Sequence, residues 1–161
     1  MRVDPDPPEL AAAVEWRCDS ASLQRLLIEV VPQAMPPSSV VFLRAAAETA
    51  GRDGSALDLA AELSMSPRML SRALARARLP TGVRLLIWMH LLIAAKVLDQ
   101  PGASIELAAE RSGYSAGSAL RRALKTLTGM TPTALIAGGA FATAKSLFAA
   151  EIAPATTRPR G

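Results

Sequence analysis

The chain has 161 residues, of which 50% are hydrophobic, 4% aromatic and 20% charged, and its formal net charge is +4. This length allows one compact domain and a smaller accessory segment. The single cysteine, Cys18, and the single histidine, His90, exclude a disulfide framework and a Cys/His zinc site within one chain.

The charges are unevenly distributed along the chain. Residues 1–63 sum to −5, residues 64–137 to +7 and residues 138–161 to +2. A basic block behind an acidic one is the electrostatic pattern expected for nucleic-acid binding. The alternative is that these Arg- and Ala-rich helices reflect a GC-rich genome and are only solvated.

The N-terminal segment is predicted to hold one short helix. Residues 1–8 are rich in Pro and Asp, which predicts disorder and argues against a secretory signal. Residues 10–16 fit a short strand or a helical turn. Asp19 or Ser20 can cap a helix through about Val31. Its apolar face would carry Leu23, Leu26, Leu27 and Val30.

A second helix is predicted after the turn PQAMPP at residues 32–37. Ser38 or Ser39 can cap this helix, which should end near Ala50. The loop GRDG at residues 51–54 then separates it from the next element.

Residues 57–76, LDLAAELSMSPRMLSRALAR, are predicted to form two short helices joined by a tight turn. The turn is predicted at Ser64, Ser66 should cap the second helix, and Pro67 suits its first position. The expected core residues of this unit are Leu57, Leu59, Ala60, Leu63, Leu70 and Leu74. On the opposite face of the second helix, helical spacing places Arg68, Ser71, Arg72 and Arg76.

A long helix is predicted over residues 83–98, and its segment LLIWMHLLI is almost wholly apolar. This segment is too short to span a bilayer, so we expect a central core helix. The alternative is that one of its faces docks the N-terminal segment or a partner. His90 is expected to be packed rather than a ligand, and Cys18 to be inert.

Residues 105–125, IELAAERSGYSAGSALRRALK, repeat the layout of the first unit. Ser104 should start the first helix and Ser115 should cap the second. The second helix would turn Leu120 and Leu124 inward. Its outward residues would be Gly117, Ser118, Arg121, Arg122 and Lys125.

The remainder of the chain is predicted to be helical in part. A turn over residues 129–132 should lead into a short helix near residues 133–137, which Gly138 and Gly139 would end. Residues 140–152 fit a further helix, and residues 153–161 a tail.

The two repeated units have the layout of a helix-turn-helix, in which the second helix lies in the DNA major groove. Arg72 and Arg122 occupy equivalent places in the two units. Arginine can pair bidentately with guanine, so these two residues are the main candidates for reading bases. Two such units joined by one long helix predict a bipartite DNA reader.

Residues 38–137 resemble the DNA-binding domain of AraC-type transcription regulators. The resemblance rests on LAAELSMSPRMLSRAL, on HLLIAAKVL, and on SIELAAERSGYSAGSALRRALKTLTGMTPTAL. It implies an all-α fold of two helix-turn-helix subdomains bridged by a helix, between an accessory segment at residues 1–37 and an extension at 138–161. One departure is Ser64, which stands where the family usually has glycine.

The resemblance also implies function. The family's DNA-contacting positions fall on Arg68, Ser71, Arg72, Gly117, Ser118, Arg121 and Arg122, and the outward charges of Arg76 and Lys125 suit phosphate contacts. The predicted function is a sequence-specific transcription regulator, without a cofactor, a metal site or enzymatic activity. The alternative is a protein-interaction module on the same scaffold with weak nonspecific DNA affinity.

The expected partner is double-stranded DNA. RNA polymerase, a second copy of the chain and an upstream domain are further candidate partners, and no membrane contact is expected. We therefore expect a cytoplasmic, nucleoid-associated bacterial protein.

Overall fold

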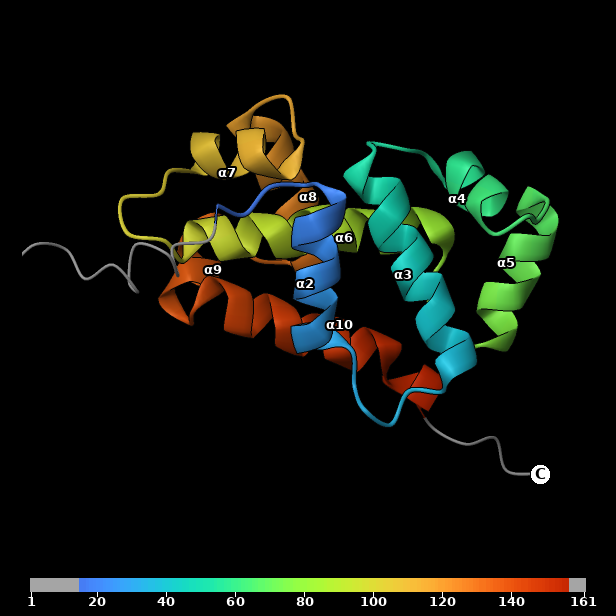
Figure 1. Ribbon diagram of the computed structural model, residues 1–161. Coiled ribbons are helices and arrows are strands. Elements are labelled where there is room, and N and C mark those ends of the chain that lie inside the picture. Colours follow the sequence, from blue (N-terminus) through green and yellow to red (C-terminus); the bar gives the residue numbers. More distant parts are fainter. Residues whose placement is uncertain (1–14, 157–161) are drawn as a thin grey trace, which may run out of the picture.

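The computed structural model describes residues 15–156, and every regular element within them is a helix. Predictions for residues 1–8, 10–14 and 157–161 lie outside this range. The helices, shown in Figure 1, are α2 (Ser20–Val30), α3 (Pro37–Gly51), α4 (Ala56–Glu62), α5 (Pro67–Arg76), α6 (Gly82–Leu98), α7 (Ile105–Ser112), α8 (Gly117–Thr128), α9 (Pro132–Ala137) and α10 (Ala140–Thr156).

The central element is α6, around which the other helices pack (Figure 1). Thr81 caps it, since its Oγ1 accepts a hydrogen bond from the Arg84 amide at 3.2 Å. Its apolar residues are buried on nearly every side, as a helix without a polar face requires. The prediction of a central core helix is therefore confirmed.

Two lobes lie toward the two ends of α6, with α3, α4 and α5 in lobe one and α7, α8 and α9 in lobe two (Figure 1). These six helices and α6 are the seven helices predicted in residues 38–137. None of the described helices is long and apolar enough to cross a membrane.

The first helix-turn-helix consists of α4 and α5. Ser55 and Asp58 form a capping box at the start of α4, and the Ser66 side chain caps α5, with Pro67 in its first turn. The turn residue Ser64 has φ +54°, in the left-handed region. Leu57 was expected in the core, but this is wrong, because its side chain is 66% exposed.

The second helix-turn-helix consists of α7 and α8. Ser104 caps α7, and Gly113 ends it with φ +89°. The predicted Ser115 cap is wrong, because the residue at the cap position is Ala116 and no side chain bonds the first turn of α8. The helices approach closely at Gly117, where an added Cβ would lie 2.8 Å from the Glu106 carboxylate.

The flanking segments also pack on the domain. Asp19 caps α2, which lies against α3 and α6, and α10 lies against α6 and α9. The α10 helix continues past the predicted end at residue 152, through Pro154 to Thr156. The predicted Ser38 or Ser39 cap of α3 is wrong, because α3 begins at Pro37 without a side-chain cap.

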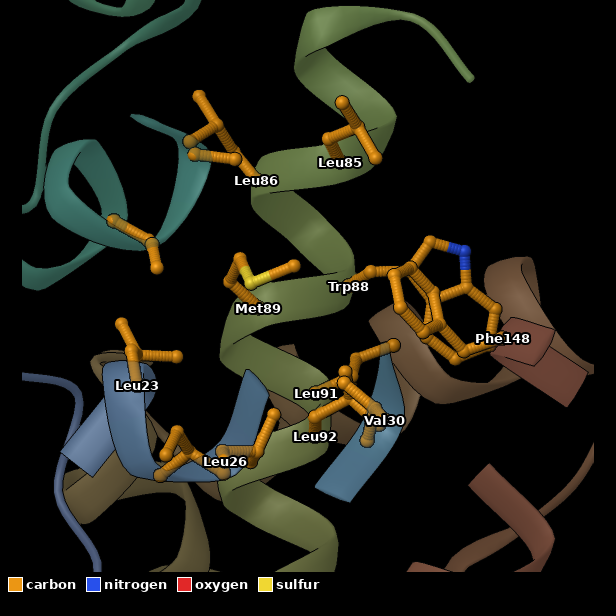
Figure 2. Close-up of a cluster of buried hydrophobic side chains, with 14 of the residues drawn as sticks. Leu23, Leu26, Val30, Leu85, Leu86, Trp88, Met89, Leu91, Leu92 and Phe148 are labelled. Carbon is orange, nitrogen blue, oxygen red and sulfur yellow. The ribbon is translucent and has the colours of Figure 1, made fainter. Parts of the chain in front are cut away.

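The core under these flanking helices is continuous with that of the domain. Figure 2 shows α2 side chains against α6, with Met89 facing the same space. On another side of α6, the Trp88 and Phe148 rings have centroids 5.3 Å apart. The apolar surface of α6 is therefore covered on one side by α2, which precedes the two units in the chain, and on another side by α10, which follows them.

Candidate nucleic-acid interface

The second helix of the first helix-turn-helix, α5, has an apolar side and a basic side. Leu70 and Leu74 are buried against the lobe. The residues on the opposite side of α5 are all exposed, and these are Arg68, Ser71, Arg72 and Arg76. The structure thus brings together the four candidate residues that the helical spacing predicted.

The second helix of the second helix-turn-helix, α8, repeats this arrangement with one exception. Leu120 and Leu124 are buried, whereas Ser118, Arg121, Arg122 and Lys125 are exposed. Gly117 does not face outward as expected, because it is buried against α7. A glycine at this place lets the first turn of α8 approach Ile105 and Glu106.

The arginines on these two helices lack partners within the protein. Within residues 15–156, none of the following five forms an ion pair or a side-chain hydrogen bond: Arg68, Arg72, Arg76, Arg121 and Arg122. Some cations elsewhere are compensated, as Arg84 is by Glu151 and Arg52 by Glu62. The helices α5 and α8 therefore present positive charge that an anionic partner can neutralise.

A shallow recess of about 510 Å³ borders the basic side of α8. Arg121, Arg122 and Lys125 line it on one side, and Thr131 and Thr133 on the other. The Lys125 ammonium donates a hydrogen bond to the Gly129 carbonyl at 3.2 Å, which holds its charge at this rim. Sequence reasoning missed the threonines, although the motif GMTPT follows directly after the basic helix.

Two further exposed residues near α5 were missed. Met69 follows Arg68 in α5 and is 55% exposed. Arg78, just beyond α5, is exposed and has φ +60°. Met69 in LSMSPRML was a signal that the sequence offered, whereas nothing in the sequence indicated the positive φ of Arg78.

His90 and Cys18 meet beneath the two lobes rather than in this interface. His90 Nδ1 lies 2.7 Å from the Ser112 carbonyl and 3.1 Å from Cys18 Sγ. Burial raises the pKa of Cys18 to about 12, so its thiol stays protonated at neutral pH. No group of three or more His, Cys, Asp or Glu side chains able to hold a metal ion occurs in the described part of the chain.

The two units and the helix between them match a known family. Residues 59–137, which run from within α4 to the end of α9, match the family model described as a helix-turn-helix domain. This segment is an AraC-type helix-turn-helix domain. Comparisons with curated proteins and with solved structures found no match.

The family identification settles the class of the domain. AraC-type domains bind DNA, usually in transcription regulation, and they are not an enzyme family. The matched segment holds α5, α6 and α8. The helices α2, α3 and α10 lie outside the matched residues.

Proposed function

We propose that the chain is a sequence-specific transcription regulator that inserts α5 and α8 into successive segments of one major groove. The observation that carries the proposal is the pair of amphipathic helices, in one AraC-type domain, whose outward arginines have no partner among the described residues. The steep salt dependence expected of phosphate contacts is one consequence.

The residues divide by the chemistry that they can offer. Arg72 and Arg122 are proposed to read guanine, and the apolar side chain of Met69 suits a thymine methyl group. The phosphate contacts are assigned to Arg68, Arg76, Arg121 and Lys125, and short polar contacts to Ser71 and Ser118. Gly117, being buried, is assigned to the packing of α8 on α7 instead of a base contact.

Selection of bound fragments from random DNA, followed by binding titrations of the enriched site, tests this proposal. Arg72→Ala and Arg122→Ala should each weaken binding by about 1–3 kcal/mol and relax specificity at one position. Arg76→Ala should weaken all sequences alike and reduce the salt slope by about one. Arg44→Ala removes the same charge from the exposed surface of α3 and serves as the control.

The double variant of Arg72 and Arg122 gives the decisive comparison. If it binds the enriched duplex as tightly as the wild type does, these helices do not read the DNA. If no sequence is enriched at all, the chain is not a sequence-specific regulator.

The alternative of a protein-interaction module relied on the apolar surface of residues 85–93 and on the acidic N-terminal helices. That surface is covered by α2, α10 and the two lobes, so it offers no docking site in this structure. Contact with RNA polymerase, pairing of two chains and association with the nucleoid belong to the proposed regulator. Each is testable by reconstitution on the selected site.

A further inference from the structure

The position of one recognition helix relative to the other depends on how the two lobes are held. Within the AraC-type domain, α6 is the single covalent link between them. Two segments outside the matched domain add contacts that cross from lobe to lobe or run along α6. These segments are residues 15–30 and α10.

Cys18 joins the two lobes directly. Its amide donates a hydrogen bond to the Arg111 carbonyl of α7 at 2.8 Å, in lobe two. Its thiol lies 3.3 Å from the Ala50 carbonyl of α3, in lobe one, and donates to it. His90 of α6 touches the same sulfur. Since the Ser112 carbonyl can only accept, His90 Nδ1 carries the proton in that bond.

The residues around Cys18 extend this connection. Glu15 forms an ion pair with Arg111 of lobe two, with N and O 3.0 Å apart. The end of α3 approaches the start of α2 so closely that a Cβ at Gly51 would lie 2.6 Å from the Ser20 amide nitrogen. Residues 15–30 are thus held against both lobes.

The second segment, α10, is fastened to both ends of α6. At one end, the Asp99 carboxylate accepts hydrogen bonds from the amides of Ala140 and Phe141 at 2.8 and 3.0 Å. At the other end, the Glu151 carboxylate accepts from Arg84 Nε at 2.7 Å and from Trp88 Nε1 at 2.9 Å. The helix therefore runs antiparallel to α6 and spans it from lobe to lobe.

Lys96 of α6 connects the two segments. Its ammonium pairs with Glu29 of α2 at 2.8 Å. The same ammonium lies 3.8 Å from the centroid of the Phe141 ring of α10 and 4.9 Å from that of Trp16. The segments on the N-terminal and C-terminal sides therefore form one structure around α6.

We propose that residues 15–30 and α10 form an inter-lobe brace that fixes the separation of α5 and α8, so that DNA binding requires one spacing between the two subsites. The inference rests on the proposed DNA-binding function. Successive base pairs are about 3.4 Å apart, and about 10–10.5 of them make one turn. One inserted base pair therefore shifts and rotates the second subsite, and a rigid pair of lobes cannot follow it.

The test compares brace variants with a variant that breaks a contact inside one lobe. Glu151→Ala removes the acceptor of Arg84 and Trp88, and Glu151→Gln keeps the shape in case the first variant folds poorly. Glu62→Ala is the matched control, because it removes the Arg52–Glu62 ion pair within lobe one. Glu15→Ala tests the other half of the brace.

The first measurement uses the enriched duplex and derivatives with one base pair inserted or deleted between the subsites. The wild type and Glu62→Ala should lose about tenfold or more in affinity on the altered spacing. The brace variants should bind the two spacings within about threefold of each other. An equal loss in all variants overturns the proposal.

The second measurement needs no DNA. Spin labels on Ser71→Cys and Ser118→Cys report the distance distribution between the recognition helices, and a protein with Cys18 alone gives the labelling background. We expect a narrow distribution that broadens in Glu151→Ala and Glu15→Ala but not in Glu62→Ala. If selection enriches no bipartite site, the proposed function fails while this distribution still decides on the brace. An unchanged width in the brace variants overturns it.

Discussion

Ser64, in the turn of the first helix-turn-helix, adopts a backbone conformation that suits glycine. Its φ of +54° brings Cβ close to the backbone, which costs an L-residue about 1–2 kcal/mol. Two other residues that are not glycine, Asp53 and Arg78, share this region of φ. The resemblance to the AraC-type family anticipated the glycine preference at this turn, but only the structure shows that Ser64 has the strained conformation.

Ser64→Gly should therefore stabilise the protein. The relief of strain exceeds the entropy that glycine loses on folding, and we expect a gain of about 0.5–1 kcal/mol in the free energy of unfolding. Urea denaturation measures it. The same change at Ser71, in the middle of α5, should instead destabilise by a similar amount. Loss of stability at both positions would contradict the strain at Ser64.

The arginines show at the residue scale what the sequence could and could not predict. The sequence pattern around Arg72 and around Arg84 predicts that each residue lies on a helix. Whether their charges are compensated depends on residues distant in the chain. Arg84 meets Glu151, 67 residues away, whereas Arg72 meets no acid among the described residues. The free charge of the interface is thus a property of the tertiary structure.

At the scale of single elements, helix starts were predicted well where the capping side chain acts locally. Asp19, Ser66 and Ser104 each accept a hydrogen bond from an amide in the first turn of their own helix. The α3 prediction failed because Pro37, which needs no amide partner, already begins the helix. Ser115 failed because the chain is extended for one more residue, through Ala116.

The two serines that precede the recognition helices should therefore respond differently to alanine. Ser66→Ala removes the acceptor for the Met69 amide, 3.2 Å away, and should lower the free energy of unfolding by about 1 kcal/mol. Ser115→Ala should change it by less than about 0.5 kcal/mol. Thermal or urea unfolding of the two variants checks this, and equal losses would mean that Ser115 also caps α8.

The packing of α2 on the domain gives another element-scale expectation. Leu26 is fully buried against the core, whereas Ile28, two residues on, is 83% exposed. Leu26→Ala should destabilise the protein by about 2–5 kcal/mol, because it leaves a cavity. Ile28→Ala should cost no more than about 0.5 kcal/mol. If urea denaturation shows that Leu26→Ala is harmless, α2 is not part of the cooperative core.

At the scale of the whole molecule, the all-α class, the two lobes and the central helix followed from periodicity and from the family resemblance. The brace did not. Cys18 and His90 are 72 residues apart, and no local pattern links them. The resemblance could not supply these contacts either, because α2 and α10 lie outside the matched segment. Segments outside the matched domain have to be placed by their long-range contacts.

The hydrogen bonds that Glu151 of α10 accepts from α6 should make the free energy of unfolding depend on pH. Burial alone would raise the pKa of Glu151, but hydrogen bonds from Arg84 and Trp88 outweigh it and lower that pKa below 4.5. A carboxylate with a lowered pKa stabilises the fold above its unfolded-state pKa. This contribution is lost as pH falls through the lower, folded-state value.

Glu151→Gln should therefore be less stable than the wild type at neutral pH, and the difference should shrink in acid. Urea denaturation at several values between about pH 7 and pH 3 measures it. A difference that stays constant over this range would show that the charge of Glu151 is not involved.

The place of α10 in the chain also orders events during synthesis. The ribosome synthesises the whole matched domain before it reaches Glu151. A nascent chain therefore contains α5 and α8 while the side of α6 that α10 covers is still exposed to solvent. Trp88 and its neighbours then face solvent or a chaperone until Phe148 arrives. A messenger RNA truncated within the codons for α10 would thus yield a chain that holds every proposed DNA-contacting residue and leaves part of its core exposed.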